Sequence, residues 1–426
     1  MKRATKRLTH LKTSLSVGVF LALRQIRRGS KATTVLIIIV MTLTFLNLVV
    51  VRGILVGLLQ GSTNVYRSGY SGDVLITNLP KKTFIENSSA IISSAANLPW
   101  VEKLTYRYIE PTNVEGSYKT KIRETDAPNA AGTTIAGIDP VLEDSATGIS
   151  RHIIEGRYLT SQDSEGILLG ANLLKKYLDF EGQGITLLEN IGIGDKVRVT
   201  LGEVRKEFTV VGILKSKVDQ VDFRAFTLDS TLRNLIGRND FNVDEIALFL
   251  KPDTDPNIVK DALIKSGVGE FARVQTWEES LPKFLLDIQN TFGLLGNVVG
   301  SIGLVAASIT IFIVIFINAI TRKKFIGILK GIGIDSLAIE FSYILMSVFY
   351  AIIGICLGLA VLYGFLVPFI DAHPIKFPFS DGILVAEIPN TLSRGLLLMV
   401  ATLIAGYIPA RIVVKQNTLD AILGRK

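Results

Sequence analysis

Side chains that could bind a metal ion are few in this sequence and lie far apart. The chain contains three histidines, His10, His152 and His373, and one cysteine, Cys356. None of them has a second Cys or His at the spacing of a metal site. The sequence therefore predicts no metal centre, and a single cysteine excludes a disulfide within the chain.

Motifs for nucleotide binding and hydrolysis are absent as well. The sequence has no GxxxxGKS/T loop, which would hold nucleotide phosphates, and neither HExxH nor GxSxG. Gly327, Gly331 and Gly333 are close together, but they follow no strand, and this context disfavours a dinucleotide site. We therefore expect no catalytic residues and no cofactor bound by this chain.

Acidic pairs occur in the polar middle of the chain, and paired carboxylates are the residues of general acid and base catalysis. The pairs are Glu143 with Asp144 and Asp253 with Asp255. In such a region they are typical of solvated surface and of helix caps. No catalytic role is predicted for them.

Residues 322–333 form a strip of charge and glycine between two long apolar runs. The strip reads RKKFIGILKGIG, and the flanking runs at 288–321 and 341–370 contain no Asp, Glu, Lys or Arg. Each run exceeds the roughly 20 apolar residues that cross a bilayer. Because a short basic loop between two spans stays on the inner side, the strip is predicted to face the cytoplasm.

Two further apolar runs bring the expected number of spanning helices to four. The first extends from residue 32 past a lone Arg52 to Leu59, and the last covers 395–410 between Arg394 and Arg411. With 16 residues, the last run spans a bilayer only if these two arginines extend toward the head groups.

The distribution of charge predicts the orientation. Residues 1–31 hold nine Lys or Arg and no acid, whereas residues 62–287 hold 26 basic and 32 acidic residues. By the positive-inside rule both termini are cytoplasmic, and residues 62–287 lie outside. The net charge of +8 therefore reflects membrane topology and not affinity for nucleic acid.

The sequence thus predicts an α-helical membrane protein with four transmembrane helices and a large extracytoplasmic mixed α/β domain inserted between the first two. The expected segments are a basic N-terminus with an amphipathic surface helix (1–31), the first span (32–60), the extracytoplasmic domain (61–287), the second span (288–321), a cytoplasmic loop (322–340), the third span (341–370), an outer loop (371–393), the fourth span (394–412) and a cytoplasmic tail (413–426).

Short strand and helix patterns alternate in the extracytoplasmic region. Strands are expected at 72–78, 101–108, 133–139, 195–201, 208–214 and 243–250, and helices at 84–96, 171–178, 229–236 and 256–266. Asp255 is placed to cap the last of these helices.

Glycines recur at close intervals in the apolar runs, where small residues let helices approach each other. Packing within one chain and a subunit interface both explain this pattern, and Gly354 and Gly358 in the third run allow the same two interpretations. The stripes in the first two runs are Gly53, Gly57 and Gly61, and Gly296, Gly300 and Gly303.

Three motifs at the ends of the predicted spans resemble a known family. The first motif opens the first span and reads LALRQIRRGSKATTVLIIIV. The second links the second and third spans and reads ITRKKFIGILKGIGIDSLAI, and the third follows the fourth span and reads GYIPARIVVKQNTLDAIL. Three segments of the extracytoplasmic region are similar to the periplasmic core domain of the same family: IIEGRYLTSQDSEGILLGANLLKKYL, IGDKVRVT and FTVVGIL. Together they resemble the permease subunits of ABC transporters of the MacB, LolC/LolE and FtsX group, with a MacB-like periplasmic core domain. Ile412 and Thr418 depart from the closing motif.

The resemblance implies where a partner ATPase docks. A coupling helix would present Lys323, Lys324 and Lys330 to the ATPase and bury Phe325, Ile326, Ile328 and Leu329. The implied docking positions are Arg322, Lys323, Lys324, Phe325, Ile326, Gly327, Ile328, Leu329, Lys330, Gly331 and Gly333, with Pro409, Ala410 and Arg411 as a second, C-terminal set.

The resemblance also implies an assembly and a location. The chain would lie in the bacterial cytoplasmic membrane with a MacB-, LolD- or FtsE-like ATPase, which binds ATP and Mg²⁺, and with a second permease copy or paralogue. ATP-driven movement would be transmitted to the outer domain, for export or extraction of lipoproteins, peptides or other amphiphiles, with a periplasmic adaptor or lipoprotein as a further partner. A non-transporting coupler that activates a cell-wall hydrolase and a receptor or scaffold without an ATPase stay open as alternatives.

Overall fold

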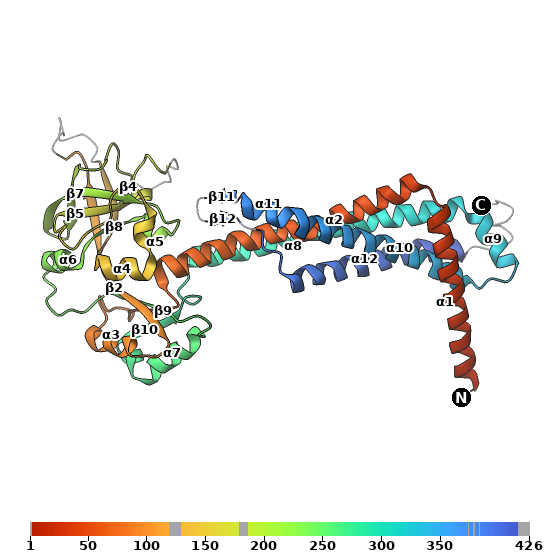
Figure 1. Ribbon diagram of the computed structural model, residues 1–426, viewed down its shortest axis with the longest axis horizontal. Coiled ribbons are helices and arrows are strands. Elements are labelled where there is room, and N and C mark those ends of the chain that lie inside the picture. Colours follow the sequence, from red (N-terminus) through yellow and green to blue (C-terminus); the bar gives the residue numbers. More distant parts are fainter. Residues whose placement is uncertain are drawn as a thin grey trace. The chain divides into compact units, whose positions relative to one another are not determined.

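The computed structural model describes residues 2–118, 129–178, 186–373, 375–377, 380–382 and 384–415. Figure 1 labels its elements. The chain divides into two compact units, which we call the helical unit (Met1–Leu59, Asp287–Lys376 and Asp381–Lys426) and the α/β unit (Gln60–Leu286 and Phe377–Ser380). The predicted tail from residue 416 onward lies outside the described residues.

Within the described residues, four helical stretches are long and apolar enough to cross a membrane. They are Lys31–Ser71, Lys283–Thr321, Ser336–Ala372 and Ile388–Val414. Each exceeds its predicted span because polar residues extend the helix at one or both ends. The last is 27 residues long, so its 16-residue apolar centre lies inside a helix of sufficient length.

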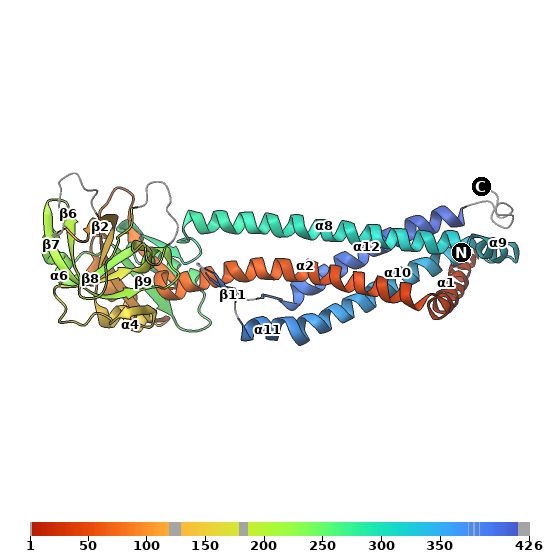
Figure 2. The ribbon, with the colours of Figure 1, turned by 90° about the horizontal axis from the view of Figure 1, so that it is seen from above.

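Among the described residues, the helical unit contains most of these four stretches together with the helices α1 and α9, and Figure 2 shows the long helices running alongside one another. Its elements are α1 (Lys2–Arg28), α2 (Lys31–Tyr66), α8 (Lys283–Thr321), α9 (Lys323–Gly331), α10 (Ser336–Val361), the π-helical turn η5 (Leu362–Leu366), α11 (Val367–Ala372) and α12 (Ile388–Val414). A buried cluster from α1, α2, α8, α9, α10 and α12 forms its core.

Helix α1 is the predicted amphipathic segment, and one of its sides packs on α10. A Cβ atom at Gly18 would lie 3.0 Å from the carbonyl oxygen of Ala338, so a side chain here would push the two helices apart by a few tenths of an ångström. Four residues earlier, the Ser14 hydroxyl donates to Asp335 (3.0 Å), whose carboxylate caps α10 at the amide of Leu337. Phe20, by contrast, is exposed on the other side.

Glycines of α10 allow α2 to pack equally closely. A Cβ atom at Gly354 would overlap the Cβ of Met41, with backbone atoms of Met41 and Thr42 only 3.2 Å away, and one at Gly358 would overlap the ring of Phe45. Gly354 and Gly358 therefore serve packing within the chain. A subunit interface at these two positions would require α2 to move away.

Gly354→Ala is expected to destabilise the helical unit by about 1–3 kcal/mol, because the backbone of α2 must shift to admit the methyl group. Gly293→Ala in α8 is the matched control, since a Cβ atom there meets nothing within 4 Å. Thermal unfolding of the purified chain in detergent should show a lower Tm for the first variant only. Equal Tm values for both variants would contradict the close packing.

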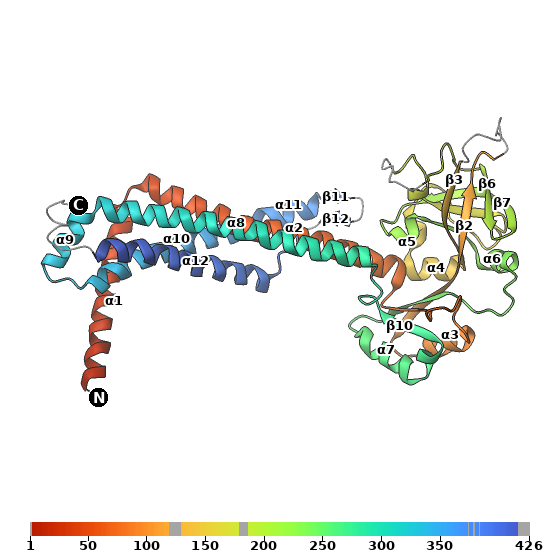
Figure 3. The same ribbon diagram turned by 180° about the vertical axis from the view of Figure 1, so that it is seen from behind.

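The α/β unit is built on one mixed sheet with the strand order β10-β1-β9-β2-β3-β8-β5-β7-β4, and β6 pairs with β2 and β7. The strands are β1 (Val74–Asn78), β2 (Val101–Glu115), β3 (Ala130–Ile138), β4 (Ile153–Gly156), β5 (Gly166–Gly170), β6 (Lys196–Leu201), β7 (Val204–Leu214), β8 (Arg224–Leu228), β9 (Glu245–Leu250) and β10 (Ala272–Thr276). The helices are α3 (Ser88–Ala96), α4 (Pro140–Thr147), α5 (Asp219–Asp222), α6 (Asp229–Ile236) and α7 (Pro256–Lys265). Figure 3 shows α7 beside β10, and β2 is the long strand that joins β9 to β3.

Helices α6 and α7 lie where the sequence predicted them, and the Asp255 carboxylate accepts from the Asn257 amide, as expected of a helix cap. The predicted helix at 171–178 is wrong. Only Ala171–Leu173 forms a 3-10 turn. The amide of Lys175 then donates to the carbonyl of Leu188, so the backbone pairs with a distant segment instead of closing a helix.

Candidate functional site

Helix α9 connects α8 to α10 and has one buried and one exposed side. Ile326, Gly327 and Leu329 are buried in the helical unit. Phe325 and Ile328 on the opposite side are 51% and 45% exposed. The exposed positions recur at the spacing of one helix face, which continues to Ile332 at the C-cap. We call this surface the α9 outer face, and its members are Lys324, Phe325, Ile328, Gly331 and Ile332.

The expectation that Phe325 and Ile328 are buried with Ile326 and Leu329 is therefore wrong for this chain. A helix of nine residues that packs on one side buries positions three apart, such as 326 and 329, and turns 325 and 328 outward. Ile332 is 71% exposed. The apolar residues of the strip are thus divided between the core and the surface.

The three lysines of the strip also differ from one another. The ammonium group of Lys330 donates to the carbonyl of Val414 (3.0 Å) at the C-terminal end of α12, where a helix has unpaired carbonyls and a partial negative charge. Lys323 is half-buried, and only Lys324 is exposed. Lys330 therefore holds α12 against α9 and is not simply a surface charge.

Lys330→Glu is expected to lower the Tm of the purified chain, because it places a negative charge against the C-terminal end of α12 and removes a contact of about 0.3–1 kcal/mol. Lys324→Glu makes the same change of charge on the exposed side of α9, and its Tm should match that of the unmodified chain. A Tm that falls equally in both variants would contradict the capping role.

The other predicted docking residues differ in exposure, and Gly333 and Arg411 are exposed. Pro409 and Ala410 are buried in the helical unit, whereas Arg411 is exposed and its guanidinium group bonds the Tyr407 hydroxyl. Arg322 is half-buried at the N-cap of α9, and Gly333 adopts a φ of 92° in the turn that follows. The exposed C-terminal candidate is therefore Arg411.

The glycine stripes of α2 and α8 contact elements of the same chain. A Cβ atom at Gly53 would lie 2.7 Å from the carbonyl of Val385. Cβ atoms at Gly296, Gly300 and Gly303 would lie 3.4, 3.5 and 2.7 Å from side chains of α2. Of the remaining two positions, Gly57 is buried and Gly61 is half-buried.

The C-terminal end of α2 is anchored in the core of the α/β unit. Helix α2 passes into a π-helical turn at Arg67–Ser71, and Tyr66 and Tyr70 are both buried, with ring centroids 5.6 Å apart. The Tyr66 hydroxyl donates to the carbonyl of Ser280 (2.8 Å), in the segment that precedes α8. This bond ties the end of α2 to the start of α8.

Buried charges surround Tyr70. Its hydroxyl donates to the carboxylate of Glu245 (2.6 and 2.7 Å), and the Arg107 guanidinium lies over its ring at 4.6 Å. Arg107 pairs with Glu143 at 2.7 Å and approaches Glu245 at 3.5 Å, while Arg224 lies 3.8 Å from Glu245. We call these five residues the junction network.

The junction network corrects the prediction that Glu143 is a solvated surface residue. Arg107 and Glu143 are each only 1% exposed. Burial acts to lower the pKa of Arg107, but the carboxylates of Glu143 and Glu245 more than offset it, and the pKa lies above its usual range. Arg107 is therefore charged in the folded state. No sequence motif identifies this pair, because its members are on β2 and α4.

Two family models match the chain. The MacB-like periplasmic core domain matches residues 32–266, which is more than half of the chain, and the FtsX-like permease C-terminal model matches residues 297–418.

Curated proteins give two relatives. An uncharacterized ABC transporter permease of Methanocaldococcus jannaschii is 27% identical over 278 residues, or 64% of this chain and 65% of the relative. The macrolide export ATP-binding/permease protein MacB of Haemophilus ducreyi is 24% identical over 308 residues, or 65% of this chain and 43% of MacB. The matched part thus spans less than two thirds of either relative.

Solved structures align with low scores. The periplasmic region of MacB from Actinobacillus actinomycetemcomitans gives a TM-score of 0.35 at 14% identity, over 50% of this chain and 92% of that one. The extracellular domain of the noncanonic ABC-type transporter YknZ from Gram-positive bacteria gives a TM-score of 0.31 at 12% identity, over 48% of this chain and 99% of that one.

The family assignment rests on the two family models. They cover most of the α/β unit and most of the helical unit, and the described residues include four apolar helices of spanning length. The chain belongs to the MacB/FtsX family of ABC transporter permeases.

Proposed function

We propose that this chain is the membrane subunit of an ABC transporter and that an ATPase subunit docks on the α9 outer face. The observation that carries the proposal is the exposure of Phe325, Ile328 and Ile332 on a helix whose other side is buried. Apolar side chains gathered on an exposed helix face mark a protein contact. ATP and Mg²⁺ would be bound by the partner, and Lys324 would lie at the edge of the contact.

The proposed mechanism is mechanical transmission without a pore. Closure of two ATPase subunits would move α9, and with it α8 and α10, in each of two permease copies. The Tyr66 hydroxyl bonds the Ser280 carbonyl and so joins the C-terminal end of α2 to the segment before α8, and Tyr70 bonds Glu245 in the junction network. Movement of α2 and α8 would therefore move the α/β unit as a rigid body. The α/β unit and the 371–393 segment would lie outside the cytoplasm, and both termini inside it.

The proposed cargo is amphiphilic, such as a lipoprotein, a peptide or a hydrophobic drug. Support comes from the similarity to MacB, whose name gives macrolide export as its activity. An adaptor on the outer side would be a further partner. In the other candidate function, the same movement activates a cell-wall hydrolase, as the resemblance to FtsX implies.

Copurification tests the proposal and separates these functions. The chain would be extracted in mild detergent, and the bound proteins would be identified by mass spectrometry for the natural sequence and for Phe325→Asp with Ile328→Asp. An ATP-binding protein that is lost in the variant supports the docking site, and an outer adaptor or lipoprotein that is retained supports transport. A recovered cell-wall hydrolase supports the coupler, and the absence of any ATPase from both samples would contradict the proposal.

A further inference from the structure

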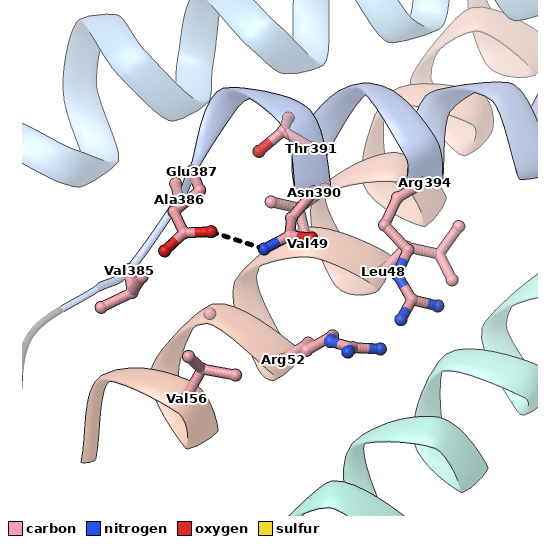
Figure 4. Close-up of a pocket in the computed structure, with 11 residues that line it drawn as sticks. Leu48, Val49, Arg52, Val56, Val385, Ala386, Glu387, Asn390, Thr391 and Arg394 are labelled. Atoms are coloured by element: carbon pink, nitrogen blue, oxygen red, sulfur yellow. Dashed lines mark hydrogen bonds between the residues drawn. The ribbon is translucent and has the colours of Figure 1, made fainter. Parts of the chain in front are cut away.

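Two arginines interrupt the apolar helices of the helical unit and line one pocket. Arg52 lies on α2 and Arg394 on α12, and both line the same pocket; Figure 4 shows the Arg394 side chain extending from α12 toward α2. An arginine within a spanning helix is costly unless it reaches water, a head group or an opposite charge. The pair therefore needs a partner.

Both arginines lie near the same boundary of the membrane. Along its helix, Arg52 is about 32 Å from Lys31, and Arg394 is about 26 Å from Arg411. The hydrocarbon core of a bilayer is about 30 Å thick. Since Lys31 and Arg411 mark one boundary, the two pocket arginines mark the other. That boundary is the one away from α9, because the last carbonyl of α12 bonds Lys330 of α9.

The pocket is lined by two arginines and one carboxylate, so its net charge is positive. Among the described residues, neither arginine forms an ion pair, and the guanidinium of Arg52 donates to the neutral amide oxygen of Asn297 (3.2 Å). The carboxylate in the pocket belongs to Glu387, which is exposed and accepts from the Asn390 side chain at 2.7 Å (Figure 4). The excess of positive charge in the pocket therefore favours an anionic ligand.

The chemistry and the position of the pocket identify the class of ligand. Guanidinium groups bind phosphate through paired N–H donors, which gives both strength and geometry. The remaining walls include the apolar side chains of Leu48, Val49 and Val56. We propose that Arg52 and Arg394 bind the phosphate of an anionic glycerophospholipid in the leaflet away from α9. The apolar wall formed by α2 would contact the glycerol and upper acyl region of the same lipid.

Native mass spectrometry of the full-length chain in detergent tests this site. The chain would be titrated separately with phosphatidylglycerol, with phosphatidylcholine and with inorganic phosphate. We expect phosphatidylglycerol to bind, and to bind at least about tenfold more weakly when Arg52→Gln and Arg394→Gln are combined, since each change removes hydrogen bonds to a charged group. Arg151→Gln with Arg273→Gln removes two exposed arginines of the α/β unit and should leave binding unchanged.

Each alternative result overturns the proposal in a defined way. Equal binding of phosphatidylglycerol to the natural chain and to the double pocket variant would overturn the site. Equal affinity for phosphatidylcholine would overturn the anionic selectivity, and binding of inorganic phosphate without the lipid would assign the pocket to a free anion. If the double variant does not fold, the single changes Arg52→Lys and Arg394→Lys keep the charge but remove the paired donors. Both should weaken phosphatidylglycerol binding, and unchanged binding in both would overturn the proposal.

Discussion

Replacing Phe325 and Ile328 together by aspartate is expected to abolish ATP hydrolysis stimulated by this chain in the reconstituted complex. Both side chains project from α9 to solvent, and a partner that covers them would have to bury two carboxylates. Central apolar contacts of an interface each contribute about 2 kcal/mol or more, so binding should weaken at least about a hundredfold. The measurement is ATPase activity in nanodiscs at a fixed concentration of the partner.

The matched control is the pair Val141→Asp and Ile258→Asp. These side chains are 67% and 50% exposed on α4 and α7 of the α/β unit, so the change in polarity is the same. ATPase activity should match that of the natural complex. Full activity in the Phe325 and Ile328 variant, at normal membrane levels of the chain, would exclude the α9 outer face as the docking site.

The lysines of the strip are expected to contribute less to ATPase docking than the family resemblance implied. Reversal of Lys323, Lys324 and Lys330 together would also remove the bond from Lys330 to Val414. A loss of activity in that triple variant therefore does not separate docking from folding. The substitutions at Phe325 and Ile328 do, because the buried side of α9 is unchanged.

The second large effect is expected at the junction network. Arg107→Met should lower the free energy of unfolding of the α/β unit by about 3–5 kcal/mol, because Glu143 is left buried without its partner. Combining it with Glu143→Leu should recover most of the loss, since the uncompensated charge is gone. Trp100 and Trp277 both belong to the α/β unit, so tryptophan fluorescence in a urea titration reports on this unit.

Arg157→Met provides the comparison for this prediction. Its guanidinium pairs with Asp163 at 2.7 Å, but the Arg157 side chain is 55% exposed, so the ion pair contributes about 0–1 kcal/mol. If Arg107→Met and Arg157→Met lowered the free energy of unfolding equally, the burial of the junction network would be contradicted. A double variant of Arg107 and Glu143 that is no more stable than Arg107→Met would contradict the stated cause.

The apolar spans could be predicted because their signal is local. The runs at 288–321 and 341–370 contain no charge, and length alone then predicts a membrane helix. The ends of the helices were less predictable. Helix α8 begins at Lys283 because the helix continues into polar residues, which hydropathy does not distinguish from a loop.

The candidate site could be predicted only in its position along the chain. The strip at 322–333 stands out in the sequence, but the side that faces the core is decided by how α9 packs on its neighbours. Phe325 and Ile326 are adjacent and equally apolar, yet the first is exposed and the second is buried. For the same reason Glu143 was not recognised as buried, because its partner Arg107 lies on a strand 36 residues earlier.

The most direct test of the docking site is a photo-crosslink from the α9 outer face in native membranes. A photoreactive residue would replace Ile328 in one sample and Ile302 in another, since Ile302 is also exposed but lies on α8. The account predicts that position 328 forms a crosslink to an ATP-binding protein and that position 302 does not. No crosslink to an ATPase from position 328, with such a crosslink formed from position 302, would contradict it.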